Sequence, residues 1–151
     1  MGLQLEYLKG GIFVHQEAYI MKVLKRFYME KSHPLCTPIV VRSLDVNISP
    51  FKTKEKDEEL LGSKVPHLSG IEVLMYLANY TQPNISFAAN LLARYSSSPT
   101  RRHWNGVKHI LHYLIRTMDM GLFYSKVSKS ALTDYTNVGY LSNPHNGRSH
   151  T

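Results

Sequence analysis

The first 28 residues carry two successive patterns of apolar and polar positions. From Leu3 to Tyr7, apolar and polar residues alternate with the period of a half-buried β-strand, and an extended pattern returns at residues 12–14. The intervening Lys9-Gly10-Gly11 is typical of a turn, because glycine adopts positive φ without strain. From Gln16 to Tyr28 the apolar residues recur at helical spacing, with basic residues on the opposite side. This stretch predicts a β-hairpin followed by an amphipathic helix.

Three further helices are expected, over roughly 69–79, 83–95 and 100–116. The second begins near Pro83, a residue suited to the first turn of a helix, and Ser96–Pro99 separates it from the third. The expected buried positions of the first two helices are Ile71, Leu74, Met75, Leu77, Ala78, Ile85, Ala88, Leu91, Leu92 and Tyr95. Before these helices, residues 42–66 contain few large apolar residues and a charged run from Lys54 to Glu59. That composition predicts a linker or a long loop.

The helix expected at 100–116 separates two kinds of side chain most clearly. At 100° per residue, one arc holds Trp104, Val107, Ile110, Leu111 and Leu114. Another arc holds Arg101, Asn105, Lys108, His109, His112 and Arg116. A basic helix face of this kind can follow a phosphate backbone. An ordinary amphipathic helix that turns lysine and arginine to solvent gives the same pattern, so the pattern alone leaves both interpretations open.

The last part of the chain predicts two more strands, at Leu122–Tyr124 and Leu132–Tyr135. Together with the hairpin and the helices, they make the expected fold class α+β. The sequence stops soon after the second strand, and a strand pair without partners exposes an apolar face. We therefore expect the sequence to end inside a domain.

The net charge of +7 is concentrated in the second half of the chain. Residues 1–80 contain ten Lys and Arg against nine Asp and Glu, whereas residues 81–151 contain eight against two. Such asymmetry favours a polyanionic partner, with nucleic acid first. A solvated basic surface is the alternative interpretation.

Other sequence signals concern location. No run of 18 apolar residues occurs, so neither a transmembrane helix nor a membrane partner is expected. The N-terminus lacks the pattern of a secretory signal peptide, and Glu6 stands where a myristoylation signal has Ser or Thr. The single cysteine, Cys36, excludes an internal disulfide framework. An intracellular location, cytoplasmic or nuclear, fits these features best.

Several kinds of catalytic chemistry lack their residues in this sequence. Neither a glycine-rich phosphate loop nor a nucleophile elbow occurs, and no small-molecule ligand is expected. His109 and His112 share a helix face but lack a third metal ligand nearby in sequence. Two-metal phosphoryl transfer needs clustered carboxylates, and the basic half offers only Asp119 and Asp134. No Asp-Asp doublet occurs, so we expect no catalytic residues and no cofactor.

A series of short segments carries a resemblance to a known family. They are residues 2–6, 11–16, 23–27, 74–78, 83–92, 98–100, 103–104, 107–108, 113–114, 121–124, 139–142 and 144–145. In this order they closely resemble the Pol polyprotein of plant copia-type LTR retrotransposons, a family of RNA-directed DNA polymerases with an RNase H activity that use magnesium. The resemblance extends from end to end of the chain.

The resemblance implies a place in the parent polyprotein. Residues 1–42 look like the end of the reverse transcriptase palm with the first thumb helix, and residues 43–66 like a linker. Residues 67–126 look like thumb and connection, and residues 127–151 like a truncated start of the RNase H domain. The missing palm and RNase H parts are therefore expected partners. The polymerase aspartates of the family would precede Met1.

Some positions depart from the family pattern. Asn137 occupies the first RNase H carboxylate position, and a neutral amide is a poor magnesium ligand. Asp134 is three residues away, an odd offset that points to the opposite face of a strand. The family has Arg and Asp where this chain has Gln82 and Asn84, and Gly in place of Arg116.

Three hypotheses follow from these observations. The first is an inactive polymerase fragment that retains electrostatic binding of an RNA–DNA hybrid or DNA. Its expected phosphate contacts are Arg94, Arg101, Arg102, Lys108, His112 and Arg116. The second is a protein-interaction module, retained by the host, that uses exposed apolar surface. The third is one part of an intact RNA-directed DNA polymerase polyprotein.

Overall fold

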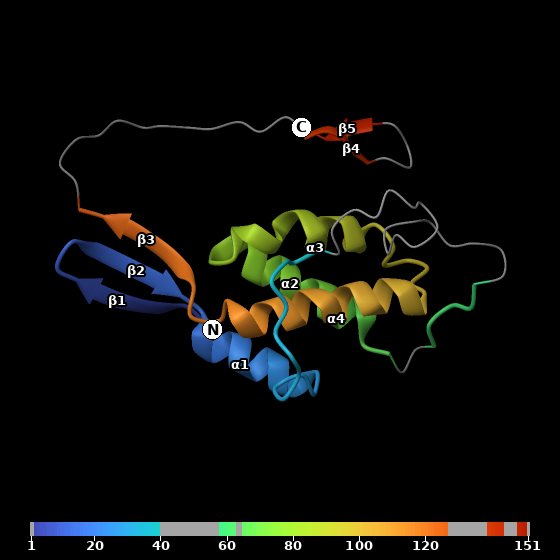
Figure 1. Cartoon of the computed structure of the whole chain (residues 1–151), viewed down its shortest axis with the longest axis horizontal. Helices are drawn as coiled ribbons and strands as arrows, with labels where there is room; N and C mark the ends of the chain where they lie inside the picture. The colour runs from blue at the N-terminus through green and yellow to red at the C-terminus, as the bar shows by residue number, and fades with distance from the viewer. Residues whose placement is uncertain (1, 40–57, 63–64, 127–138, 144–147, 151) are drawn as a thin grey trace.

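The protein has a mixed α+β fold, as the hydrophobic pattern predicts (Figure 1). The computed structural model describes residues 2–39, 58–62, 65–126, 139–143 and 148–150. The elements in chain order are β1 (Gln4–Leu8), β2 (Gly11–His15), α1 (Glu17–Arg26), α2 (His67–Tyr80), the short 3₁₀ helix η1 (Pro83–Ile85), α3 (Ser86–Ala93), α4 (Arg101–Arg116), β3 (Gly121–Ser125), β4 (Gly139–Asn143) and β5 (Arg148–His150). The strand expected at 132–135 and most of the expected linker lie outside the described residues.

The first three strands form one antiparallel sheet in the order β1-β2-β3. Phe13 lies opposite Glu6 on β1 and opposite Phe123 on β3. The expectation that the strand at 122–124 lacks other partners is wrong, because β3 pairs along its whole length with β2. Gly11 permits this pairing, since a Cβ atom there would lie 2.1 Å from the carbonyl oxygen of Tyr124. Separately, β4 and β5 pair antiparallel with each other.

The core lies among the four α-helices, and α4 lies between α1 and the α2–α3 pair (Figure 1). Its fully buried side chains include Ile20, Leu24, Leu74, Leu77, Ile85, Leu92, Ile110, Leu111 and Leu114. Gly106 lets α3 and α4 approach closely, because a Cβ atom there would lie 2.8 Å from Leu92 Cδ2. Trp104, expected in the buried arc, is only half-buried and packs beside Phe27 and His67. No helix among the described residues is long and apolar enough to cross a membrane.

Buried glutamines connect the helices to the start and end of the sheet. The hydroxyl of Thr81 donates to Gln16 Oε1 at 2.7 Å, which joins the end of α2 to the start of α1. Gln82 Nε2 donates to the carbonyl oxygens of Thr117 and Met120, each at 3.1 Å. These two carbonyls lie in the turn between α4 and β3. Gln82 therefore fixes the path by which the chain leaves α4 and joins the sheet.

Candidate nucleic-acid interface

Helix α4 begins at a capping box in which histidine takes the place of the usual glutamate or glutamine. The backbone N–H of His103 donates to the side chain of Thr100, and the backbone N–H of Thr100 donates to His103 Nδ1 at 3.0 Å. Because Nδ1 accepts this bond, the neutral ring carries its proton on Nε2. His103 is fully buried and stacks on Tyr95, with ring centroids 4.4 Å apart and planes 5° from parallel. This cap fixes where the basic side of α4 begins.

One row of basic side chains runs along the outside of α4. Arg101 and Arg116 are exposed at its two ends, and Lys108 is half-buried between them. The 15 helical steps from Arg101 to Arg116 correspond to about 22 Å of helix. Arg94 is exposed at the end of α3, beyond the N-terminal end of this row. We call Arg101, Lys108 and Arg116 the α4 row.

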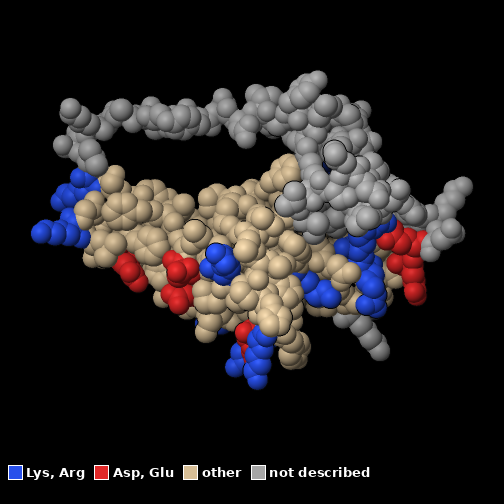
Figure 2. All heavy atoms as spheres, viewed as in Figure 1, with Lys and Arg blue, Asp and Glu red and all other residues tan. Residues whose placement is uncertain are grey.

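The basic surface as a whole is broken into groups. Figure 2 shows Lys and Arg in several separate patches on the face in view, divided by uncharged surface and in places flanked by acidic side chains. The excess positive charge of the second half of the chain therefore does not form one continuous patch on that face. The α4 row itself consists of three separate basic side chains, two exposed and one half-buried.

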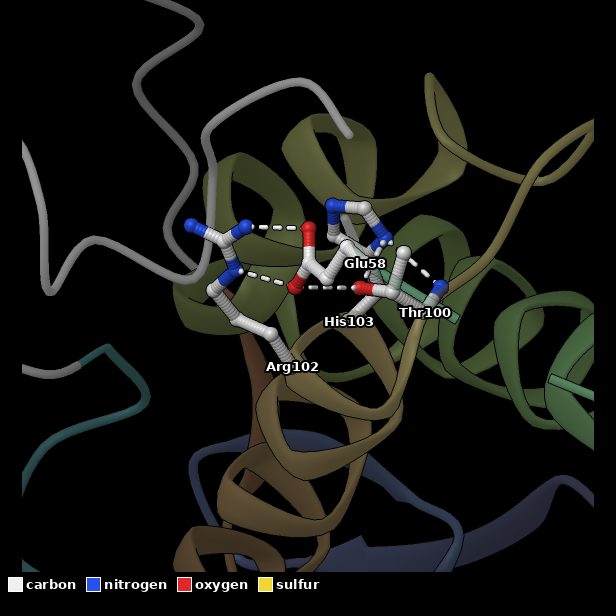
Figure 3. A network of polar contacts seen from close by, with 4 residues as sticks. All are labelled: Glu58, Thr100, Arg102 and His103. Atoms are coloured by element: carbon white, nitrogen blue, oxygen red, sulfur yellow. Dashed lines mark hydrogen bonds and ion pairs between the residues drawn. The ribbon is translucent and has the colours of Figure 1, made fainter. Parts of the chain in front are cut away.

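Arg102 makes an internal ion pair. Its Nε donates to Glu58 Oε1 at 3.0 Å, and its Nη2 donates to Glu58 Oε2, so the guanidinium binds the carboxylate through two nitrogens (Figure 3). The side chains of Arg102 and Glu58 are only 18% and 25% exposed. Arg102 was expected to contact phosphate, and the structure instead places it against a carboxylate from the segment before α2.

His112, a second expected phosphate contact, holds another segment of the chain. Its Nδ1 donates to the carbonyl oxygen of His33 at 2.6 Å, and the backbone N–H of Leu35 donates to the carbonyl oxygen of His112 at 3.2 Å. One turn earlier, His109 Nε2 donates to the carbonyl oxygen of Thr37 at 3.0 Å. The segment between residues 33 and 37 therefore lies along this side of α4. Of the six expected contact residues, the structure brings Arg101, Lys108 and Arg116 into one row.

Burial changes the acid–base behaviour of three side chains near α4. It lowers the pKa of His67 below its usual 6.5, and the neighbouring His103 lowers it further. Burial also lowers the pKa of His109, an effect opposed by the hydrogen bond to Thr37 and reinforced by His112. Burial raises the pKa of Tyr95, and the positive charges of Arg94 and Arg102 oppose that rise. Both histidines are therefore predominantly neutral at pH 7.

The described residues do not fit a magnesium ion. Among them, no group of three or more His, Cys, Asp and Glu side chains lies close enough to hold a metal. Asp134 and Asn137, at the expected RNase H position, lie outside the described residues.

The sequence pattern did not reveal four polar residues, three buried and one half-buried, that position α4. They are Thr100, His103, Gln82 and Glu58. One signal was available, because a Thr followed three residues later by a side chain with an acceptor is the spacing of a capping box. The partners of Gln82 and Glu58 lie far away along the sequence, so no local pattern could identify them.

Comparison with known proteins identifies several relatives. The chain is 33% identical to the retrovirus-related Pol polyprotein of transposon TNT 1-94 from Nicotiana tabacum, over all of this chain and 11% of that protein. It is 30% identical to the Pol polyprotein of transposon RE2 from Arabidopsis thaliana, over 93% of this chain and 9% of that protein. An uncharacterized mitochondrial protein of Arabidopsis thaliana is 36% identical over 51% of this chain and 68% of its own length.

The comparison with family models found no match. The comparison with solved structures found none either. The chain spans about a tenth of the polyproteins it matches. It matches them collinearly along nearly its whole length, and it therefore belongs to the copia-type retrotransposon Pol polyprotein family as one segment of such a protein.

Proposed function

We propose that this segment is catalytically inactive by itself and that it contacts the sugar–phosphate backbone of a nucleic acid through the α4 row. The observation that carries the proposal is the geometry of that row. Arg101, Lys108 and Arg116 lie on one side of α4 over about 22 Å, a side that the segment between residues 33 and 37 also contacts through His109 and His112. Lysine and arginine at this spacing contact phosphates without reading bases, so the expected binding is independent of sequence.

Binding through this row has a calculable salt dependence. Neutralising three phosphates gives a slope of about −2.7 in log affinity against log salt. The affinity for an RNA–DNA hybrid should therefore fall about 40-fold between 50 and 200 mM salt. Fluorescence anisotropy of a labelled hybrid at the two salt concentrations measures this, with circular dichroism to establish that the chain is folded.

A matched pair of variants tests whether the α4 row is responsible. The triple variant R101E/K108E/R116E reverses the row, and K22E/K25E/R26E makes the same change in net charge on α1, where all three residues are exposed. We expect the first to abolish binding and the second to weaken it much less. Equal losses in the two variants would show that net charge alone governs binding. Undiminished binding by the first would exclude the row.

The proposed inactivity is supported by the described residues, among which no group of three or more His, Cys, Asp and Glu side chains could hold a metal ion. The four aspartates of the chain, Asp45, Asp57, Asp119 and Asp134, include no adjacent pair. We expect no primer extension and no hybrid cleavage by the purified chain with magnesium. A rate above that of heat-treated protein would contradict this part of the proposal.

One observation favours a second candidate function, contact with another protein. Leu5, Tyr7 and Tyr124 lie on the same face of the sheet as Ile12, Val14 and Leu122, and Tyr7 is 80% exposed. An apolar face of this kind is typical of a protein contact. Sedimentation of the chain at rising concentration, compared with L5K/Y7K, tests the simplest case, in which a second copy covers the face. A wild-type chain that stays monomeric and matches the variant would count against that case.

A further inference from the structure

The ion pair between Glu58 and Arg102 sits at the N-terminal end of the α4 row. Arg102 is adjacent in sequence to Arg101, the first residue of that row. Its guanidinium is bound on two nitrogens by the Glu58 carboxylate, and the hydroxyl of Thr100 donates to the same carboxylate at 3.2 Å (Figure 3). The charge of Arg102 is therefore neutralised inside the chain beside the first residue of the row, about 100° further around the helix than Arg101.

The backbone next to Glu58 is also attached to the start of α4. The N–H of Leu61 donates to the carbonyl oxygen of Pro99 at 2.8 Å, and Leu60 forms an antiparallel bridge with Thr100. These contacts fix the segment of Glu58 beside the first turn of α4. The Glu58 carboxylate is therefore held against Arg102 in two ways: by the hydrogen bond from Thr100 and by the backbone contacts of Leu60 and Leu61.

A carboxylate and a phosphate offer the arginine fork the same geometry. Both present two oxygens that accept parallel N–H bonds from one guanidinium. The side chains of Arg102 and Glu58 are 18% and 25% exposed. Their ion pair is therefore more stable than a fully exposed one, and solvent still reaches it. A phosphodiester that arrives along the α4 row meets Arg102 with this competitor already in place.

We propose that Glu58 is an intramolecular competitor of nucleic-acid phosphate for Arg102, so that the segment before α2 limits how much of the α4 surface is available. This inference rests on the proposed function, and it names a regulation of the same surface. In the resting chain Arg102 contributes no phosphate contact. Displacement of Glu58 adds one contact to the row.

Two single variants of the full chain separate this effect from a change of net charge. E58Q weakens the internal pair while it keeps the shape of the side chain, and E59Q removes one charge from its exposed neighbour. With a short RNA–DNA hybrid as the probe, E58Q should bind about fivefold more tightly than the wild type, the scale of a partly exposed ion pair. Its salt slope should steepen by about one phosphate contact. E59Q should leave the slope unchanged.

Removing the arginine tests the same idea from the other side. R102Q alone should change hybrid affinity less than twofold, whereas E58Q/R102Q should lose the whole gain of E58Q. If R102Q weakens binding of the otherwise unchanged chain as much as R101Q does, Arg102 already contacts phosphate and the competition is excluded. Equal affinity and slope for E58Q and E59Q would exclude it as well.

The outcomes distinguish this inference from the proposed function. A wild-type chain and an E58Q chain that both fail to bind at low salt overturn the α4 row itself. If hybrid binding is weakened by R101Q but unchanged by E58Q, only the proposed competition is overturned. Thermal unfolding of each variant is measured beside binding, and R102Q and E58Q/R102Q are compared with each other because both lack the ion pair. Equal affinities of those two are expected, since Glu58 then has no arginine to mask.

Discussion

Gln82 is the residue whose replacement should most clearly separate packing from hydrogen bonding in this fold. It is 1% exposed, and its amide group donates to two carbonyl oxygens at 3.1 Å each. Methionine has nearly the same length and volume but no donor, so Q82M leaves both carbonyls without this partner while it creates little cavity. The buried carbonyl of Thr117 that loses its partner costs about 1–3 kcal/mol, and the partly buried carbonyl of Met120 adds about 1 kcal/mol, so Q82M should lower the free energy of unfolding by about 2–4 kcal/mol.

The assay is urea unfolding followed by circular dichroism. With a slope of about 1.5 kcal/mol/M, the expected loss lowers the urea midpoint by about 1–3 M. Q82E should be less stable still, because its carboxylate faces the two carbonyls as an acceptor only. The control is N84A, which removes an exposed bond from Asn84 Nδ2 to the Tyr113 hydroxyl and should cost less than about 1 kcal/mol. A Q82M protein within 0.5 kcal/mol of the wild type (about the size of a neutral surface change) would refute the reasoning.

Two further predictions concern neighbouring glycines and a buried histidine. G11A should destabilise the chain by about 1–3 kcal/mol and reduce amide protection in β3, because the added Cβ meets the carbonyl oxygen of Tyr124 at 2.1 Å. G10A meets nothing closer than 3.9 Å and should change the stability by about 0.5 kcal/mol or less, so equal effects of the two variants would contradict the pairing of β2 with β3. The pKa of His67 is lowered in the folded chain, so the unfolded chain binds more protons below pH 6.5 and stability should fall as the pH drops from there towards the folded pKa. The urea midpoint of H67L should fall less between pH 7 and pH 5 than that of the wild type. The fall that remains is due in part to His109, whose pKa is also lowered. The same pH dependence in H67L and wild type would show that the pKa of His67 does not change on folding.

Most elements of this fold could be predicted from local pattern, because their apolar residues recur at the period of a strand or a helix. The half-burial expected of the first strand is wrong, since all five residues of β1 are exposed, and β4 and β5 were not predicted. Alternation identified β1 and β2, and helical spacing identified α1, α2, α3 and α4 within a few residues. The buried stripes also agree with the core, except that Met75, Tyr95 and Trp104 are half-buried. On α4 the buried positions also include His103 and Gly106. The capping box turns the histidine inward, and the close approach of α3 leaves no room for a side chain at Gly106.

The candidate interface was predicted less well, and the reason is distance along the chain. Helical periodicity places a side chain on a face but says nothing of which other segment covers that face. Arg102 meets a carboxylate 44 residues away, and His112 meets a carbonyl 79 residues away. Each contact occupies a side chain that helical periodicity alone had assigned to a continuous basic surface. The same limitation explains why the pairing of β3 with β2 was not predicted from the sequence.

The narrowness of the α4 row has a consequence for how such a segment would act in a longer protein. Three phosphate contacts support only weak binding, since even proteins with more contacts bind non-specifically with dissociation constants of about 10⁻⁴–10⁻⁶ M. In a polyprotein the row is tethered to the rest of the chain. If another part of that chain holds the nucleic acid, the row meets it at an effective concentration in the millimolar range, where a weak contact is occupied much of the time. Weak binding by the isolated segment and a useful contribution within a polyprotein are therefore compatible. The salt slope, which counts contacts, is for that reason a better measure of the row than the affinity of the isolated chain.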